Sequence, residues 1–332
     1  MNEFVDQAME SFERLLGEKP RSSPLPRPDS CSVRLCTNNR TVIATRRETP
    51  ERAKFEVGVL KELHANGAPV PSILAFDGNW LMQEDLGPDR LSRKIYRIWE
   101  SECERWLEVA LNSLSRIHSA ATAAGLESRV PKIGTKPDWI REFIDTPRRI
   151  GRFLGIPCPK LDNHRLMYTL NVPGRSFVKW DARPTNAAAS PDWSVAWYDW
   201  EHCGRRNRLD DVVCLIADES VPDWPVAESR LLEGNMVYFD EGHYPGGPYT
   251  YLRTFGSLHM AVRLSILIKA MMRRGEWDYQ LGSGLAKGPP QTIRNILARA
   301  RRWAEAALVT RPLADWYEAV DEALSASSTR SD

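Results

Sequence analysis

The spacing of hydrophobic residues changes near residue 87. Before it, an amphipathic segment over about 3–16 precedes two stretches at 32–36 and 41–46, in which apolar and polar residues alternate around the Asn-Asn turn of TNNR. Alternation predicts half-buried strands, and helical spacing returns at about 50–66. Two more strands are expected in PSILAF and NWLMQEDL, on either side of the turn DGN. This part of the chain predicts a small antiparallel sheet with a helix across it.

Beyond LGPDR, apolar residues recur every three to four positions, which is typical of amphipathic helices. The helices predicted by this spacing cover about 102–124, 137–152, 208–217, 249–273, 289–309 and 313–325. One β-rich insert at 175–200 interrupts them. We therefore expect an α+β protein with two lobes. Residues 1–86 form the sheet-containing lobe, residues 87–326 form the mostly helical lobe, and residues 327–332 form a disordered tail.

Composition and charge narrow the class of protein. The 332 residues are 42% hydrophobic and 27% charged, which is typical of a folded globular chain. The 45 basic and 44 acidic residues nearly cancel, so we expect neither nucleic acid nor a membrane as partner. The six cysteines show no metal-ligand spacing and indicate reduced thiols in a cytoplasmic protein. The most apolar run, 260–272, carries Arg263 and Lys269 and is too short to span a bilayer.

The β-rich insert contains the candidate chemistry. It reads as SFVKW, DARPTN, AAA, SPD and WSVAWYDW, and a hairpin of this kind brings Asp181, Asn186 and Asp199 to one rim of the sheet. Phosphoryl transfer needs this set, because one carboxylate takes the proton of the acceptor hydroxyl while an amide and a second carboxylate hold Mg²⁺. Arg183 adds a positive charge directed at phosphate. A tight turn capped by Asp181 and Asn186 is the alternative interpretation.

Five motifs in order resemble the aminoglycoside phosphotransferase and choline kinase-like enzymes, which are small-molecule relatives of protein kinases. In chain order they are EVGVLKELHANGAPVPSILAFDGNWLMQEDLGPDRL (56–91), LNSLSRIHSAATAAGL (111–126), KWDARPTN, YDWEHCG and LDDVV. The resemblance covers roughly residues 30–220. It implies a two-lobed protein kinase-like fold that binds ATP and Mg²⁺ between its lobes. The implied reaction transfers the γ-phosphate to a hydroxyl of a small molecule.

The resemblance also implies roles for individual residues. Asp181 would be the catalytic base, and Asn186 and Asp199 would be the magnesium ligands. Glu56 would pair with the strand cation that binds the phosphates, and Asp211 would be a structural anchor. The hinge against the adenine, with its backbone groups making the hydrogen bonds, would comprise Gln83, Glu84, Asp85 and Leu86.

Three departures from the family pattern leave a second function open. Arg46 replaces the strand lysine of the frame V-A-I-K, and alternation places Ala44 and Arg46 on one side of the strand and Arg47 on the other. The stretch PDSCSVRLC lacks the family's glycines, and Lys179-Trp180 replaces the usual His-Gly of the catalytic loop. The alternative to an active ATP-dependent kinase is therefore a catalytically silent nucleotide-binding or interaction protein with a kinase fold.

The sequence does not identify the phosphate acceptor. A polycationic aminoglycoside would need an acidic pocket, whereas RRGEWD and ARARRW are rich in arginine, which argues against it. A neutral sugar, an amino alcohol and an anionic metabolite remain open. His118 is expected to be packed within its helix rather than catalytic.

Overall fold

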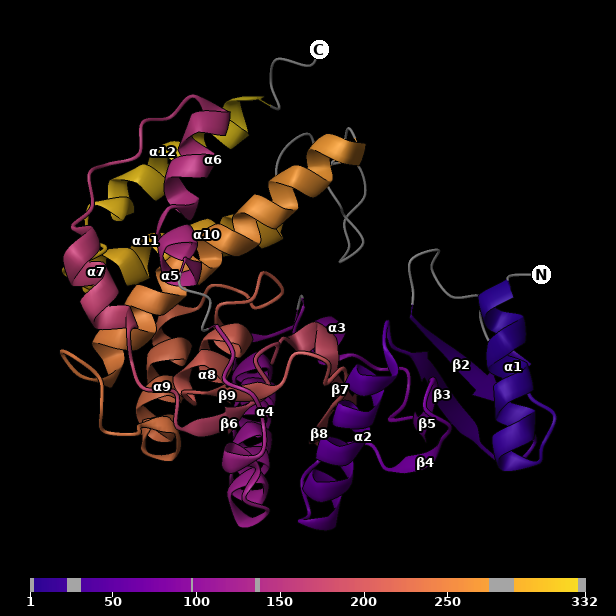
Figure 1. Cartoon of the computed structure of the whole chain (residues 1–332). Helices are drawn as coiled ribbons and strands as arrows, with labels where there is room; N and C mark the ends of the chain where they lie inside the picture. The colour runs from indigo at the N-terminus through magenta and orange to yellow at the C-terminus, as the bar shows by residue number, and fades with distance from the viewer. Residues whose placement is uncertain (1–2, 23–30, 97, 135–137, 275–289, 328–332) are drawn as a thin grey trace.

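The computed structural model describes residues 3–22, 31–96, 98–134, 138–274 and 290–327. A sheet-containing lobe occupies one side of the molecule and a larger helical lobe the other (Figure 1). The predicted α+β, two-lobed architecture is confirmed. The expected lobe boundary at residues 86 and 87 falls between the last strand of the sheet and the next helix, and it remains a prediction.

The first lobe is a five-stranded antiparallel sheet with strand order β1-β2-β3-β5-β4. Its strands are β1 (Arg21–Ser22), β2 (Ser32–Cys36), β3 (Thr41–Arg46), β4 (Ile73–Phe76) and β5 (Trp80–Glu84). Helices α1 (Glu3–Leu16) and α2 (Pro50–Ala65) lie on opposite sides of this sheet (Figure 1). Thr49 caps α2 through its side chain, and Pro50 opens the helix where no backbone N–H is needed.

Helix α1 covers one face of the sheet because its apolar residues share one side. Val5, Ala8 and Phe12 are buried in a separate small core. The strand residues in that core are Val33, Leu35, Val42, Ala44, Trp80 and Met82. Alternate strand residues point to opposite faces, so β3 presents Val42 and Ala44 to α1 and turns its odd-numbered residues towards the second lobe.

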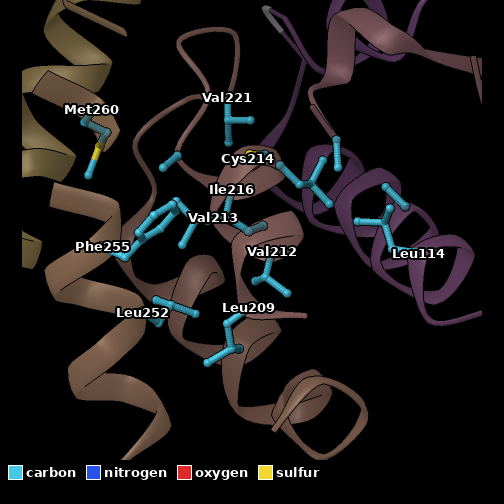
Figure 2. Packing of buried hydrophobic residues seen from close by; sticks show 14 of the residues in the cluster. Leu114, Leu209, Val212, Val213, Cys214, Ile216, Val221, Leu252, Phe255 and Met260 are labelled. Carbon is cyan, nitrogen blue, oxygen red and sulfur yellow. The ribbon is translucent and has the colours of Figure 1, made fainter. Parts of the chain in front are cut away.

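The second lobe is mostly helical. Its helices are α3 (Leu91–Ile95), α4 (Glu100–Ala123), α5 (Trp139–Ile144), α6 (Thr146–Leu154), α7 (Asn163–Leu170), α8 (Leu209–Ile216), α9 (Pro225–Phe239), α10 (Pro248–Arg274), α11 (Gln291–Ala306) and α12 (Leu313–Ser327). Every residue of α8 is buried, and its apolar side chains pack between Leu114 of α4 and Leu252 and Phe255 of α10 (Figure 2). Because α8 is surrounded by protein, it holds its polar side chains in fixed positions.

Helix α10 is long and apolar enough, by length and composition alone, to cross a membrane. In this fold it packs against α6, α8 and α11, and 44% of its most apolar 18-residue window is buried. The apolar composition of α10 is therefore explained by its packing against the other helices of the second lobe.

Four short strands complete the second lobe, and their pairing corrects the sequence-based expectation. Strand β6 (Ser176–Val178) pairs with β9 (Gly204–Arg206), whereas β7 (Ala187–Ser190) pairs with β8 (Ser194–Trp197). The stretch that holds Asp181 and Asn186 therefore connects two separate sheets instead of closing a hairpin. Non-local pairing of this kind is not encoded in local alternation.

Other boundaries also differ from the prediction. The helix expected at 137–152 is two helices, α5 and α6, which meet at Asp145, and Pro147 lies in the first turn of α6, where proline begins helices. Helices α3, α7 and α9 were not predicted. Helix α12 runs to Ser327; the rest of the predicted disordered tail, 328–332, lies outside the described residues, as do 135–137 and 275–289.

All six cysteines are free thiols, as their spacing predicts.

The packing of α1 generates a stability prediction. Phe12→Ala removes a fully buried ring from the small core, and large-to-small changes of this kind cost about 3–5 kcal/mol. The matched control is Glu10→Ala on the exposed side of the same helix, which should change stability by less than about 0.5 kcal/mol. Urea unfolding followed by circular dichroism measures both. Equal midpoints for the two variants would show that α1 does not stabilise this lobe.

Candidate active site

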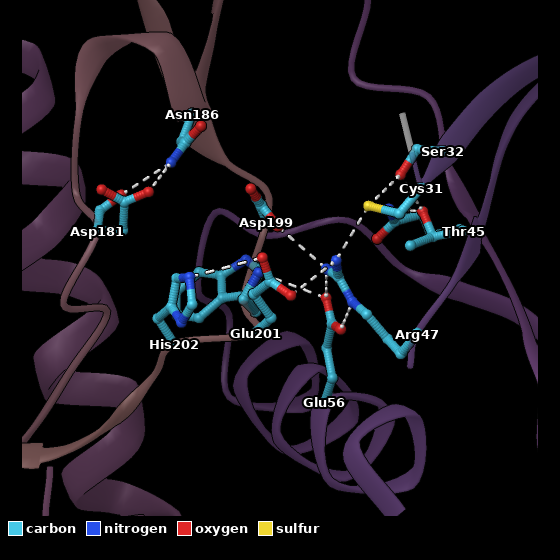
Figure 3. Close-up of polar contacts among 12 residues, drawn as sticks. Cys31, Ser32, Thr45, Arg47, Glu56, Asp181, Asn186, Asp199, Glu201 and His202 are labelled. Atoms are coloured by element: carbon cyan, nitrogen blue, oxygen red, sulfur yellow. Dashed lines mark hydrogen bonds and ion pairs between the residues drawn. The ribbon is translucent and has the colours of Figure 1, made fainter. Parts of the chain in front are cut away.

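The predicted base and metal ligands lie in neighbouring segments of the second lobe, opposite α2. Asp181 follows β6, Asn186 ends the short 3₁₀ turn Pro184–Asn186, and Asp199 follows β8. Figure 3 shows Asp181 and Asn186 on one side of Asp199, with Arg47 and Glu56 on the other. The structure thus brings four of the predicted groups, Asp181, Asn186, Asp199 and Glu56, into one region between the lobes.

Asp211 anchors the catalytic loop from α8. Its carboxylate accepts hydrogen bonds from the backbone N–H of Lys179 at 2.9 Å and of Trp180 at 2.7 Å. His118 Nε2 contacts the same carboxylate at 2.9 Å. Asp211 and His118 are both buried. The predicted anchor role of Asp211 is confirmed, and His118 is a packed residue of α4 that supports it.

Lys179 joins the two halves of the site. Its ammonium donates to the carbonyl oxygen of Asp181 at 3.0 Å and to that of Asp199 at 2.9 Å. The side chain is fully buried, and its Nζ lies 5.3 Å from the ring centre of Trp200. A buried cation needs such acceptors to offset its desolvation. Lys179 therefore fixes the backbone of Asp181 relative to that of Asp199.

Trp180 adopts a backbone conformation that favours glycine. Its φ is 70°, in the left-handed region that glycine adopts most easily. Non-glycine residues in this region cost of order 1–3 kcal/mol and persist when their surroundings hold them. The bonds of the Trp180 N–H to Asp211 and of the Cys214 thiol to the Trp180 carbonyl, at 2.9 Å, supply this restraint.

Asn186 is oriented for a metal. Its amide nitrogen donates to the Asp181 carboxylate at 2.6 Å and to the Asp181 carbonyl at 3.1 Å. The amide oxygen consequently points away from Asp181 (Figure 3), and together with the carboxylate of Asp199 it forms the hard oxygen set that Mg²⁺ prefers. Two protein oxygens leave most of the octahedral positions of Mg²⁺ to phosphate oxygens and water, which fits the way this ion binds beside nucleotide phosphates.

The strand cation is Arg47, and the expectation of Arg46 is wrong. Arg47 pairs with Glu56 through Nε at 2.6 Å and Nη2 at 2.9 Å, whereas Arg46 is exposed and donates to Gln7 of α1 at 2.8 Å. Ala44 and Arg46 do lie on one face of the strand and Arg47 on the other. Helix α1 covers the face of Ala44, so Arg47 is the arginine that reaches Glu56 of α2.

Most donors of Arg47 are engaged. A guanidinium has five N–H groups. Two of them donate to Glu56, a third donates to Asp199 Oδ1 at 3.1 Å and a fourth to the sulfur of Cys31 at 3.5 Å. Nη1 also forms an ion pair with Glu201 at 3.3 Å. Burial opposes the charge of Arg47, but the hydrogen bonds and charge of Glu56, with Asp199 and Glu201, outweigh it and raise its pKa. A phosphate oxygen that binds Arg47 therefore competes with these carboxylates.

The predicted hinge comprises the last two residues of β5, Gln83 and Glu84, and the two that follow, Asp85 and Leu86. The carboxylate of Glu84 accepts from the backbone and side chain of Ser72, at 3.1 and 3.0 Å, and that of Asp85 accepts from Arg34 at 2.8 Å. Leu86 is half-buried. Contacts of the hinge backbone with a base remain a prediction.

The side chain of Gln83 has a buried amide oxygen that could accept a hydrogen bond from a nucleotide base. Its side chain is buried on the face of the sheet that carries Thr45, and its amide nitrogen lies 3.4 Å from the Thr45 hydroxyl. Its amide oxygen has no hydrogen-bond partner among the described residues. Because an unpaired buried oxygen is costly, this oxygen fits a site completed by the polar edge of a ligand.

Arg183 is bound by two carboxylates. It donates to Asp218 at 2.7 Å and to Glu219 at 2.6 Å, and Arg263 of α10 donates to the same Glu219 at 2.7 Å. Burial opposes ionisation of Glu219, but the charges of Arg183 and Arg263 outweigh it and lower its pKa to about 2. The predicted action of Arg183 on phosphate is untested by these contacts.

Sequence reasoning missed two contributors. The bridging role of Lys179 depends on contacts between residues that are distant in the chain. Glu201, which forms an ion pair with Arg47, was not singled out. Asp199 has a φ of 63°, in the left-handed region, so the chain turns here and local alternation does not indicate where Glu201 lies.

No protein-family model matches the sequence, and no curated protein does. Solved structures do match. Choline kinase LicA from Streptococcus pneumoniae is 13% identical and superposes with a TM-score of 0.53 over 92% of this chain and 100% of its own. Macrolide 2'-phosphotransferase MphH from Brachybacterium faecium is 14% identical, with a TM-score of 0.53 over 81% and 96%. Spectinomycin phosphotransferase, solved with ADP and spectinomycin, is 10% identical, with a TM-score of 0.53 over 94% and 98%.

These likenesses define the fold of the chain. It has the kinase-like fold of the aminoglycoside phosphotransferases and choline kinases, so the resemblance seen in the motifs is confirmed at the level of the fold. At such low identity, the activity has to be argued from the residues of the site.

The assignment of Arg47 instead of Arg46 as the partner of Glu56 is tested by comparing one variant of each arginine. Arg47→Met leaves the buried carboxylate of Glu56 without its cation, and such breaks cost about 3–5 kcal/mol. Arg46→Met removes an exposed charge next to α1 and should cost less than about 1 kcal/mol. Urea unfolding of both variants measures the difference. An equal loss of stability in the two variants would contradict the assignment of Arg47.

Proposed function

We propose that the protein is an ATP-dependent phosphotransferase that moves the γ-phosphate to a hydroxyl of a small molecule. The observation that carries this proposal is the arrangement around Asp181. Asn186 holds the carboxylate of Asp181 with its amide nitrogen and keeps its amide oxygen free on the side away from Asp181. One residue thereby orients the base and contributes to the metal site, a geometry that a simple turn cap does not require.

In the proposed reaction, Asp181 orients the acceptor hydroxyl and takes its proton as the oxygen attacks the γ-phosphorus, while the bond from this phosphorus to the bridging oxygen breaks and ADP leaves. Lys179 keeps Asp181 and Asp199 at a fixed separation through their carbonyls. Asn186 and Asp199 would hold Mg²⁺, which when bound neutralises phosphate charge. Arg47 supplies a further positive charge between the lobes, and Gln83 with the hinge backbone would bind the base.

A second candidate function rests on Arg47. Its hydrogen bond to Asp199 supports a catalytically silent protein, in which Arg47 keeps this bond and nucleotide binds without transfer. The two functions differ in acceptor-dependent formation of ADP. As part of the proposal, the partner is a small hydroxylated molecule, with no nucleic acid and no membrane, and the protein is cytoplasmic, in keeping with its free thiols.

The function is tested by Asp181→Asn. This change keeps the size of the side chain and removes the proton acceptor. Turnover of Mg-ATP with a hydroxylated acceptor, found by screening for ADP release, should fall at least about 100-fold. Nucleotide affinity, measured by calorimetry, should stay within about twofold, because a lost transition-state interaction lowers kcat without weakening binding. Turnover like that of the wild type would reject Asp181 as the base.

Asp199 is tested through binding. Asp199→Ala should remove the gain in ATP affinity that Mg²⁺ provides, at least about tenfold, since even residues behind metal ligands contribute that much. Calorimetric titrations with Mg²⁺ and with EDTA give this ratio. The control is Asp192→Ala in the exposed turn between β7 and β8, which should keep the ratio of the wild type. An unchanged ratio in Asp199→Ala would exclude Asp199 as a metal ligand.

A further inference from the structure

The guanidinium of Arg206, on β9, lies among three aromatic rings beside the catalytic loop. Its central carbon is 4.4 Å from the ring centre of Trp139, 4.5 Å from that of Trp180 and 5.6 Å from that of Phe255. We call these three rings the aromatic cage. They come from α5, from the catalytic loop and from α10. Arg206 also forms a buried ion pair with Asp210.

The surroundings of Arg206 are built to keep it in place. The hydroxyl of Tyr251 donates to Asp210 at 2.6 Å and accepts from the amide of Asn207 at 2.8 Å. At Gly134, a Cβ would lie 2.0 Å from Nη1 of Arg206, so this position needs glycine for the guanidinium to fit. Arg206 is thus held by a carboxylate, by three rings and by the shape of the chain.

The aromatic cage adjoins the proposed base. Trp180 directly precedes Asp181 in the loop, and the rings of Trp139 and Trp180 lie 5.8 Å apart. Both tryptophans are half-buried, so part of each remains accessible. Aromatic cages of this kind bind organic cations, quaternary ammonium groups above all. In this protein the chain's own cation occupies the cage, and an external ammonium would meet a like charge there.

The other charged groups on this side of Asp181 neutralise one another. Arg183 and Arg263 are paired with Asp218 and Glu219. Arg206 is paired with Asp210. The three arginines are therefore matched by three carboxylates. His259, on α10, is next to this network. Burial lowers its pKa, and the charges of Arg263 and Arg183 lower it further, to about 3, so its imidazole is neutral at physiological pH.

On the basis of the proposed phosphotransfer, we propose that the acceptor is an uncharged hydroxylated molecule that packs on Trp139 and Trp180 and presents its hydroxyl to Asp181. Arg206 is then the residue that determines this specificity, because it fills the cation site. The chain would differ in this respect from the choline kinase whose fold it shares.

The cage is tested with tetramethylammonium as the probe. Arg206→Ala removes the side chain from the cage, so that both its volume and its charge are vacated, and leaves Asp210 without its cation. Quenching of tryptophan fluorescence should then report binding at least tenfold tighter than in the wild type. The matched control is Arg263→Ala, which removes an arginine that is paired with a carboxylate and lies outside the aromatic cage, and it should bind no better than the wild type.

Two results would overturn the proposal. One is a folded Arg206→Ala variant that binds tetramethylammonium no more tightly than Arg263→Ala. The other needs no variant: saturable millimolar binding of tetramethylammonium to the wild-type protein, with tryptophan quenching, would show that the cage is open.

Acceptor specificity is tested separately with the wild-type enzyme and Mg-ATP. Release of ADP should depend on uncharged sugars or polyols, and phosphorylation of choline, an aminoglycoside or an anionic hydroxy acid would overturn the assigned class. Calorimetry with Mg-ATP separates a failure of the proposed phosphotransfer from a failure of the acceptor proposal. Absence of nucleotide binding contradicts the proposed phosphotransfer. The tetramethylammonium titration still shows whether Arg206 keeps cations out of the aromatic cage.

Discussion

The site depends on the burial of one guanidinium between the two lobes. Arg47 leaves the end of β3 and is surrounded by Glu56 of α2 and by Asp199 and Glu201 of the second lobe. A buried charge is tolerated only when partners offset its desolvation, so these carboxylates have to be near it. This requirement links the sheet, α2 and the segment after β8 in one arrangement. Strand, helix and catalytic lobe are thereby aligned by electrostatics as well as by packing.

A second set of bonds fixes the catalytic loop to the core. Asp211 stands on α8, a helix buried along its whole length, and it binds two successive backbone N–H groups of the loop. Lys179 extends this support to Asp199. The loop is therefore held by charge-assisted hydrogen bonds to rigid elements, which gives Asp181 a defined position before any ligand binds. Preorganisation of this kind is what positioning catalysis requires.

The sequence predicted those parts of the site that are local in the chain. Asp181, Asn186 and Asp199 stand in a recognisable order, and Asp211 follows at a short distance, so their grouping was predictable. Arg47 was not predictable, because strand alternation gives two faces without saying which one α1 covers. The pairing of β6 with β9 likewise joins segments that are far apart in the sequence, and local alternation does not show which segments pair. Helices α7 and α9 have apolar faces set by their neighbours in the lobe, and local spacing did not reveal them.

A crystal structure with a non-hydrolysable ATP analogue and Mn²⁺, which is located by its anomalous scattering, tests the proposed site most directly. We expect the nucleotide base beside Gln83 and the hinge, and a metal bound by the Asn186 amide oxygen and the Asp199 carboxylate at about 2.0–2.2 Å, as for a hard divalent ion. The γ-phosphate should face Asp181, and Arg47 should exchange one of its protein acceptors for a phosphate oxygen. A metal bound elsewhere, or a nucleotide outside the space between the lobes, would contradict the proposed site.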